Sequence, residues 1–209
     1  MSFAHLHASL TFAYMKLKNN YFILRHGQTP YQTEKKNRIV YPWPETSPIR
    51  LTEKGREQAK KAAKILSRKK IDLIFASDFP RTRQTAKIAA KEIQKKIHLD
   101  KRLRDIDLGI FKGKTKDEFY QDFPISSSEK RFRQKPLKGE SWFDCKARML
   151  NFLKEIDRKY KGKNILIVSH GDPLWLLEGA VKGWSIKKMI EIKKNKMNRI
   201  QTGELRELR

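Results

Sequence analysis

The sequence holds a single cysteine, Cys145, among its 209 residues. One thiol cannot form an internal disulfide, so a disulfide-stabilised scaffold is excluded and a reducing, cytoplasmic compartment is expected. Cys145 lies in a segment with helical periodicity, which favours a structural role over a nucleophilic one. No apolar run reaches the length of about 18 residues that a membrane span needs. No membrane partner is therefore expected.

Acidic residues are scarce as well. The chain has 23 Asp and Glu against 48 Lys and Arg, which gives a formal net charge of +25. Such a surplus suits an anionic partner, from a phosphate ester to a nucleic acid. The basic residues are spread over nearly every segment, however, and no nucleic-acid-binding motif accompanies them. A lysine-rich surface is the simpler interpretation, and nucleic acid is not an expected partner.

The first 20 residues stand apart from the rest. They have neither the positively charged start nor the cleavage site of a secretory signal, and Met15 looks like a more natural beginning. Residues 1–20 are therefore expected to be a loose extension from an extended start-codon assignment. Residues 21–209 are expected to form one domain, because no linker or repeat divides them and their length suits a single core.

Two short apolar runs each end in a histidine followed by a glycine. The first covers residues 21–24 and leads to His26, and the second covers residues 165–168 and leads to His170. Short apolar runs between polar residues are typical of buried strands. Ligands bind beyond the carboxyl ends of such strands in an open α/β sheet. The two imidazoles are therefore predicted to lie side by side at one edge of a sheet.

Helical and strand patterns alternate along the chain. Amphipathic periodicity predicts helices over residues 53–68, from Asp78 to about Lys95, over 141–160 and over 173–181. Asp78 is expected to cap the second of these helices, and the proline-rich residues 28–50 to form a loop without a helix. Further strands are predicted over residues 71–76 and near the C-terminus. This order predicts an α/β fold, a three-layer α/β/α sandwich with a mainly parallel central sheet.

Two arginines accompany the histidines: Arg25 directly precedes His26, and Arg81 comes just past the strand at residues 71–76. Arginine repels a cation, and no carboxylate cluster with ligand spacing is present, so neither a metal nor another cofactor is expected. A guanidinium group matches phosphate oxygens with two parallel hydrogen bonds. Neutral His26 would be a competent phosphorus nucleophile. The two arginines, together with His170, would stabilise charge on the phosphoryl oxygens.

A leaving alkoxide needs a proton, which a carboxylic acid in the pocket would supply. Asp105 and Asp107 are the candidates. If residues 103–109 are extended, both side chains point to the same face. Periodicity does not choose between them.

The pattern resembles the histidine phosphatase superfamily, the phosphoglycerate mutase-like group, over nearly everything from Tyr21 onward. The resemblance lies in five motifs in the family order: Arg25-His26-Gly27-Gln28-Thr29, Leu51–Ala59, Ser77–Ala86, Gly139-Glu140-Ser141 and Val168-Ser169-His170-Gly171. It implies the phosphatase branch: a metal-independent phosphatase that acts on a small phosphorylated substrate and forms a phosphohistidine on His26.

The resemblance also implies roles for individual residues. His26, Asp105 and His170 would be catalytic, with Asp105 preferred as the general acid although an aspartate replaces the usual glutamate there. Phosphate binding would fall to Arg25, Arg81, Gly27, Gln28, Thr29, Gln32 and Gly171. Gln32 stands where an asparagine is common in the family, and Lys112 replaces a carboxylate.

Two other functions stay open. One is a phosphoglycerate mutase, although mutases of the family usually have a longer insertion than residues 122–139 provide. The other is a non-catalytic relative that binds anions or nucleic acid. The substrate itself and the oligomeric state cannot be predicted. The candidates for binding a second anionic group of the substrate are Arg38, Arg50, Arg104, Lys112 and Lys114. The candidates for stacking on a ring of the substrate are Tyr41 and Trp43.

Overall fold

The computed structural model describes residues 15–33, 40, 49–124, 129–195 and 197–208. A five-stranded sheet in the order β3-β2-β4-β1-β5 forms its centre. The strands are β1 (Asn20–Arg25), β2 (Leu73–Ala76), β3 (Ile97–Leu99), β4 (Asn164–Ser169) and β5 (Leu205–Leu208). The first four are parallel, and β5 pairs antiparallel with β1 at one edge. The predicted mainly parallel sheet is confirmed.

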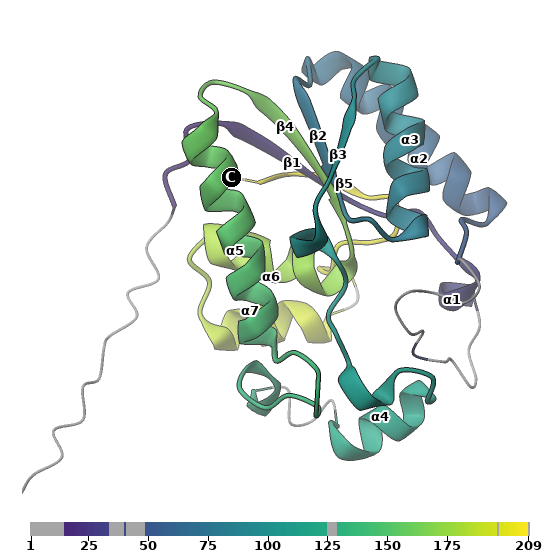
Figure 1. The fold of residues 1–209 in the computed structure, drawn as a ribbon, viewed down its shortest axis with the longest axis vertical. Coiled ribbons are helices and arrows are strands. Elements are labelled where there is room, and N and C mark those ends of the chain that lie inside the picture. Colours follow the sequence, from purple (N-terminus) through teal and green to yellow (C-terminus); the bar gives the residue numbers. More distant parts are fainter. Residues whose placement is uncertain (1–14, 34–39, 41–48, 125–128, 196, 209) are drawn as a thin grey trace, which may run out of the picture.

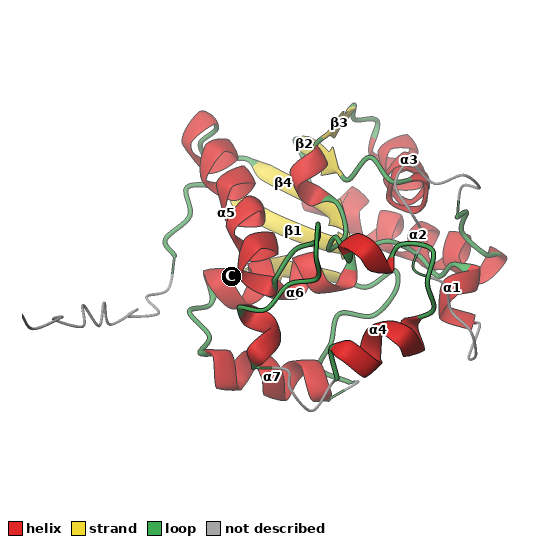
Figure 2. Cartoon of the chain, turned by 60° about the horizontal axis from the view of Figure 1, so that its bottom comes forward, coloured by secondary structure: helices red, strands yellow, loops and turns green. Residues whose placement is uncertain are grey.

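Helices lie on both faces of this sheet (Figures 1 and 2). They are α1 (Pro30–Thr33), α2 (Glu53–Leu66), α3 (Pro80–Ile93), α4 (Lys116–Asp122), α5 (Trp142–Lys159), α6 (Gly171–Val181) and α7 (Ile186–Lys194). Helices α2 and α3 pack together on one face, and α5 and α6 on the other, while α4 lies apart from these layers (Figure 1). The predicted three-layer α/β/α sandwich is confirmed.

The central strands are apolar throughout because each of their faces meets a separate core. In β1, Tyr21 and Ile23 pack with α5 and α6, whereas Phe22 and Leu24 pack with α2 and α3. Side chains alternate along a strand, so a strand covered on both faces must be apolar at every position. This double coverage explains the continuous apolar runs that lead to the two histidines.

The predicted loose extension is wrong for residues 15–20. Met15 donates its amide to the carbonyl of Val181 at 3.1 Å, and the amide of Lys18 donates to the Asp157 carboxylate at 3.0 Å. Asn19 is buried and bonds the same carboxylate through its side chain. These contacts fix the segment against α5 and α6. Residues 1–14 lie outside the described residues.

Two local predictions also need correction, and one helix was not predicted. The proline-rich segment contains the short helix α1, because Pro30 suits the first turn of a helix. Asp78 does not cap α3: the capping position belongs to Phe79, and the Asp78 carboxylate pairs with Arg104 at 2.7 and 2.5 Å. Helix α7 was not predicted, and it begins at the side-chain cap of Ser185.

Cys145 is fully buried in α5. Burial raises the pKa of its thiol, which disfavours the nucleophilic thiolate. The expected structural role fits this position. None of the described helices combines the length and the apolar composition needed to cross a membrane.

Candidate active site

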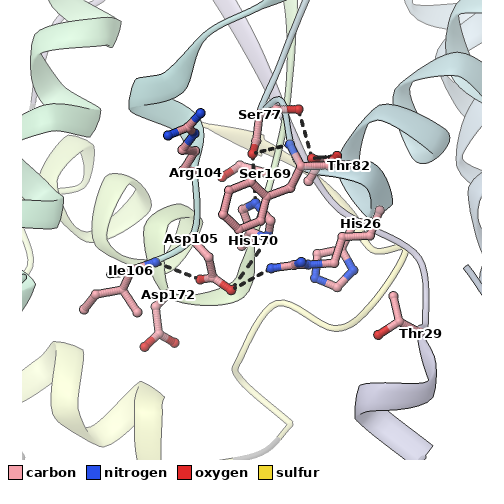
Figure 3. A network of polar contacts seen from close by, with 12 residues as sticks. His26, Thr29, Ser77, Thr82, Arg104, Asp105, Ile106, Ser169, His170 and Asp172 are labelled. Carbon is pink, nitrogen blue, oxygen red and sulfur yellow. Dashed lines mark hydrogen bonds and ion pairs between the residues drawn. The ribbon is translucent and has the colours of Figure 1, made fainter. Parts of the chain in front are cut away.

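The carboxyl ends of three neighbouring strands bring the predicted basic residues together. Arg25 ends β1, His170 directly follows β4, and Arg81 lies in the first turn of α3 beyond β2. Arg25 pairs with Ser169 in the sheet register, so the next residues on the two strands, His26 and His170, become neighbours. Their ring centroids are 5.3 Å apart (Figure 3).

The His26 ring is held in one orientation by its own backbone. Its Nδ1 lies 2.8 Å from the carbonyl oxygen of Gly27. A carbonyl only accepts, so Nδ1 carries the proton and Nε2 keeps its lone pair. Burial, followed by the charges of Arg81, His170 and Arg25, holds the pKa of His26 well below 6.5. The imidazole is therefore neutral at physiological pH, as a nucleophile must be.

His170 lies beside it in an equally buried position. Its Nε2 is 3.0 Å from the hydroxyl of Ser77, and its Nδ1 is 3.7 Å from Oδ2 of Asp105 (Figure 3). That Nδ1 makes no hydrogen bond to any of the described residues. Burial and then the charge of Arg81 hold the pKa of His170 well below 6.5. The neutral ring can donate one hydrogen bond into the site.

Arg25 is partly buried, and one of its nitrogens has no protein partner among the described residues. Its Nη1 donates to the carbonyl of Ile200 at 2.9 Å, whereas its buried Nε has no partner among the described residues. Gly171 makes room for it, because a Cβ there would lie 3.3 Å from the guanidinium carbon. A buried unpaired donor is costly, and an anion in the pocket would satisfy it.

The two candidate carboxylates have different surroundings. Asp105 lies beside His170 (Figure 3), and its Oδ2 is 3.3 Å from Nη2 of Arg81. Asp107 is engaged elsewhere: it accepts from the ammonium of Lys112 at 2.7 Å and from the amide of Gly109 at 2.7 Å. The geometry therefore favours Asp105 as the carboxylate next to the histidines.

Arg25, His26, Arg81 and Asp105 line a cavity of about 410 Å³. Thr29 and Gln32 line it too, and both the amide and the hydroxyl of Thr29 donate to Oε1 of Gln32 at 2.8 Å. The lining residues that the sequence interpretation missed include Asp172, which pairs with Lys193, and also Lys116 and Arg148. Asp172 directly follows the second His-Gly pair, and that position was the signal available in the sequence.

Two predicted phosphate ligands, Gly27 and Gln28, do not line this cavity. The Gly27 amide donates to the hydroxyl of Thr85 at 3.1 Å, and a Cβ on this glycine would meet the carbonyl oxygen of Gly55 at 2.2 Å. Close packing against α2 therefore requires this glycine. The side chain of Gln28 accepts from the Thr52 hydroxyl at 3.0 Å, and Gln28 does not line the cavity.

The candidates for a second anionic group or a ring are scattered. Arg104 and Lys112 line the cavity, but both already pair with carboxylates. Arg50 and Lys114 are exposed. Arg38, Tyr41 and Trp43 lie outside the described residues. Over the part of the chain that the structure describes, no three His, Cys, Asp or Glu side chains gather as a metal site would require.

We expect the free energy of unfolding to fall as the pH drops below about 6.5. The folded chain keeps the rings of His26 and His170 neutral, because the pKa of each is held well below 6.5. The unfolded chain takes up protons near 6.5, so each ring removes up to about 1.4 kcal/mol per pH unit, until the folded pKa is reached. Urea unfolding between about pH 7 and 5 checks this. A slope unchanged in His26→Asn would contradict it.

Sequence comparison gives this pocket a family context. Residues 21–204 match the histidine phosphatase superfamily (branch 1). A probable phosphoglycerate mutase of Photorhabdus laumondii subsp. laumondii is 31% identical over 171 residues, which cover 78% of this chain and 74% of the relative. Phosphoserine phosphatase 1 of Hydrogenobacter thermophilus is 29% identical over 143 residues, which cover 66% of this chain and 67% of the relative.

Solved structures of other proteins also resemble this chain. The protein YhfR of Bacillus stearothermophilus is 32% identical with a TM-score of 0.69, covering 82% of this chain and 83% of that one. A mycobacterial glucosyl-3-phosphoglycerate phosphatase shares the fold, with a TM-score of 0.72 at 23% identity, covering 90% of this chain and 88% of that one. The family match spans nearly all of the domain that carries the two histidines and two arginines. The chain belongs to the histidine phosphatase superfamily, branch 1.

Proposed function

We propose that this protein is a phosphatase that hydrolyses phosphomonoesters without a metal ion, through a phosphohistidine on Nε2 of His26. One observation carries the proposal: His26 is a buried, neutral imidazole whose Nδ1–H is bonded to the Gly27 carbonyl at 2.8 Å. The lone pair on Nε2 is thereby available next to Arg25 and Arg81, which line the same cavity. Two guanidinium groups beside a neutral nucleophile suit a dianionic phosphoryl group.

The reaction has two steps. In the first, Nε2 of His26 bonds to phosphorus, the ester P–O bond breaks, and protonated Asp105 gives its proton to the leaving oxygen. In the second, water bonds to phosphorus, the P–N bond breaks, and Asp105 takes a proton from the water. Arg25 and Arg81 neutralise charge on the phosphoryl oxygens in both steps. The neutral ring of His170 donates a hydrogen bond to one of these oxygens.

The relatives support the reaction class. Phosphoserine phosphatase 1 is among the sequence relatives, and a glucosyl-3-phosphoglycerate phosphatase and an alpha-ribazole phosphatase share the fold. All three names describe enzymes that release phosphate from a small phosphorylated molecule. We assign this chain the same class of substrate, and residues Thr29 and Gln32 a place beside the phosphate.

Trapping of the intermediate tests the mechanism. The protein, treated with a metal chelator, is mixed with a ³²P-labelled phosphomonoester and quenched in alkali. We expect label on the protein that survives alkali and is lost in acid, as a phosphoramidate is, and peptide mapping places it on His26. Full activity without any labelled intermediate, or loss of activity with the chelator, contradicts the proposal.

A mutase is the second candidate, because a relative 31% identical to this chain is named a probable phosphoglycerate mutase. Both reactions pass through the same phosphohistidine, so product analysis separates them. Incubation with 3-phosphoglycerate yields free phosphate if the protein is a hydrolase. It yields 2-phosphoglycerate, with little free phosphate, if the protein is a mutase.

A further inference from the structure

The segment that carries Asp105 has little regular structure of its own. Residues 104–108 connect two short 3₁₀ turns, Lys101–Leu103 and Gly109–Phe111, and lie outside the helices and strands. The side chain of Asp105 is 36% exposed, whereas His26 and His170 are buried. Something other than the sheet must therefore fix the position of this carboxyl relative to His26.

The guanidinium of Arg148, on α5, binds backbone carbonyls of this segment and of the turn before it. Its Nη1 donates to the carbonyl of Arg102 at 2.7 Å and to that of Arg104 at 2.8 Å. Its Nη2 donates to the carbonyl of Asp105 itself at 2.9 Å. Three carbonyls within four residues thus accept from one guanidinium. Helix α5 is an 18-residue helix that is packed into the core, so it is a rigid support.

Glu140 completes the support from the other side. Its carboxylate accepts from Nε of Arg148 at 2.7 Å and from Nη2 at 2.8 Å, which is a bidentate pair. The same carboxylate accepts from the amide of Asp107 at 3.0 Å, and the amide of Glu140 donates to the Asp107 carbonyl at 2.8 Å. The pair therefore binds the backbone on both sides of Asp105.

The side chain of Asp105 is then left with one oxygen for chemistry. Its Oδ1 accepts from the amide of Ile106 at 3.0 Å. Its Oδ2 lies within 3.3 Å of Arg81 and 3.7 Å of His170 (Figure 3). With the peptide groups on both sides fixed, the position of Oδ2 depends on the backbone that Arg148 holds. Catalytic groups lose efficiency steeply when they move by as little as about 1 Å.

We propose that Arg148 is a positioning residue for proton transfer: it fixes the peptide of Asp105 so that Oδ2 reaches the leaving-group oxygen. This inference rests on the proposed function, in which Asp105 is the general acid. Arg148 lines the cavity, but all three of its guanidinium nitrogens already donate to protein oxygens, so the proposal assigns it no part in binding the phosphate. Loss of Arg148 should therefore slow formation of the phosphohistidine, and so lower kcat/KM, for esters whose leaving group needs a proton, and should spare that step for esters whose leaving group does not.

The leaving group provides the test. An alkyl phosphate, such as glycerol phosphate, leaves as an alkoxide and needs the proton, whereas the p-nitrophenolate of p-nitrophenyl phosphate leaves without one. For Arg148→Met we expect kcat/KM to fall about 100-fold on the alkyl phosphate and less than about fivefold on the aryl phosphate. The ratio of the two values does not depend on how much of the protein is folded. Equal losses on both substrates overturn the proposal.

Two controls make the outcomes distinct. Asp105→Asn should change the same ratio in the same direction; if it does not, the assignment of the general acid fails, and with it the proposed function in its present form. If Asp105→Asn shifts the ratio and Arg148→Met does not, only the role of Arg148 fails. Arg102→Met is the matched control on the same segment. Its guanidinium pairs with Asp100 and Glu155 and should leave the ratio unchanged.

A milder variant covers the case in which Arg148→Met does not fold. Arg148→Lys keeps the cation and three donors but loses the planar fork that reaches three carbonyls and Glu140 together. We expect a smaller change of the ratio in the same direction. A ratio identical to that of the unmodified protein overturns the proposal, since the fork is the feature that holds Asp105.

Discussion

Replacing His26 with alanine is expected to lower kcat by about 10⁵-fold, the scale of loss that follows removal of a nucleophile. The methyl group cannot bond to phosphorus, and no second group stands in for it. The neighbouring ring of His170 has its Nε2 hydrogen-bonded to Ser77, and its free Nδ1 faces Asp105. Phosphate binding should persist, because Arg25 and Arg81 remain, so KM should change far less than kcat.

The measurement is the release of phosphate from an aryl phosphate in the presence of a chelator, at saturating substrate. His98→Ala is the matched control, because His98 is exposed on the edge strand β3 and lies outside the cavity. It should leave kcat unchanged. Activity of His26→Ala within tenfold of the control, an order-of-magnitude margin, would show that the phosphoryl group passes through some other atom.

The sequence was most informative where the chain must be apolar on two faces. The runs before His26 and His170 predicted two adjacent strands, and the structure pairs them in register from Asn20 to Arg25. A parallel sheet puts the ends of such strands at one edge, so the meeting of the two imidazoles followed from the strands alone. A continuous apolar run is a short-range pattern that does not depend on distant contacts, and for this reason the two strands could be predicted from the sequence.

The choice between Asp105 and Asp107 could not be made in the same way. The argument from alternation assumed an extended segment, but 3₁₀ turns flank it. Its backbone is fixed by Arg148 of α5 and by Glu140, which lies just before that helix. These partners lie more than 30 residues away along the chain, as the separations of 43 and 33 positions show. No local pattern of residues can predict a conformation that distant side chains impose.

Gly27 and Gln28 show the opposite error. Both lie next to His26 in the sequence, and proximity alone suggested phosphate binding. The structure uses them to dock the loop onto α2: Gly27 packs on the carbonyl of Gly55, and Gln28 bonds Thr52. The glycine at position 55 was the signal for this contact, because two glycines that face each other allow a close approach of the backbone. Proximity in sequence to His26 therefore did not distinguish residues that line the cavity from residues that support the loop.

The second large effect is expected from Arg25→Met, which should lower kcat/KM by about 10²–10³-fold. Arg25 lies partly buried beside His26: its Nη1 donates to the Ile200 carbonyl, and its buried Nε has no partner among the described residues. Burial lowers the pKa of this guanidinium, yet arginine stays protonated at neutral pH. A buried cation with a spare donor gains most from a bound phosphoryl group, and gains more as negative charge moves onto the phosphoryl oxygens.

Lysine should not rescue this position. Arginine can hold the Ile200 carbonyl with one nitrogen and meet phosphate with another, because the guanidinium is a rigid fork. The single ammonium of Arg25→Lys cannot hold the Ile200 carbonyl and bind phosphate in the same way at once. We therefore expect Arg25→Lys to lie within about tenfold of Arg25→Met in kcat/KM, far below the unmodified protein. Restoration of activity by lysine would mean that only the charge at this position matters.

Phosphate binding gives an independent readout of the same residue. Inorganic phosphate at 100 times its Kd should stabilise the unmodified protein by about 2.7 kcal/mol, a rise of roughly 5–10 °C in Tm. Arg25→Met should lose most of this rise at the same phosphate concentration, whereas Arg56→Met, whose exposed guanidinium pairs with Glu53 on α2, should keep it. If Arg25→Met keeps the full rise, Arg25 is not a phosphate ligand. The buried Nε would then be an unpaired donor that phosphate does not satisfy, and Arg81 would carry the binding.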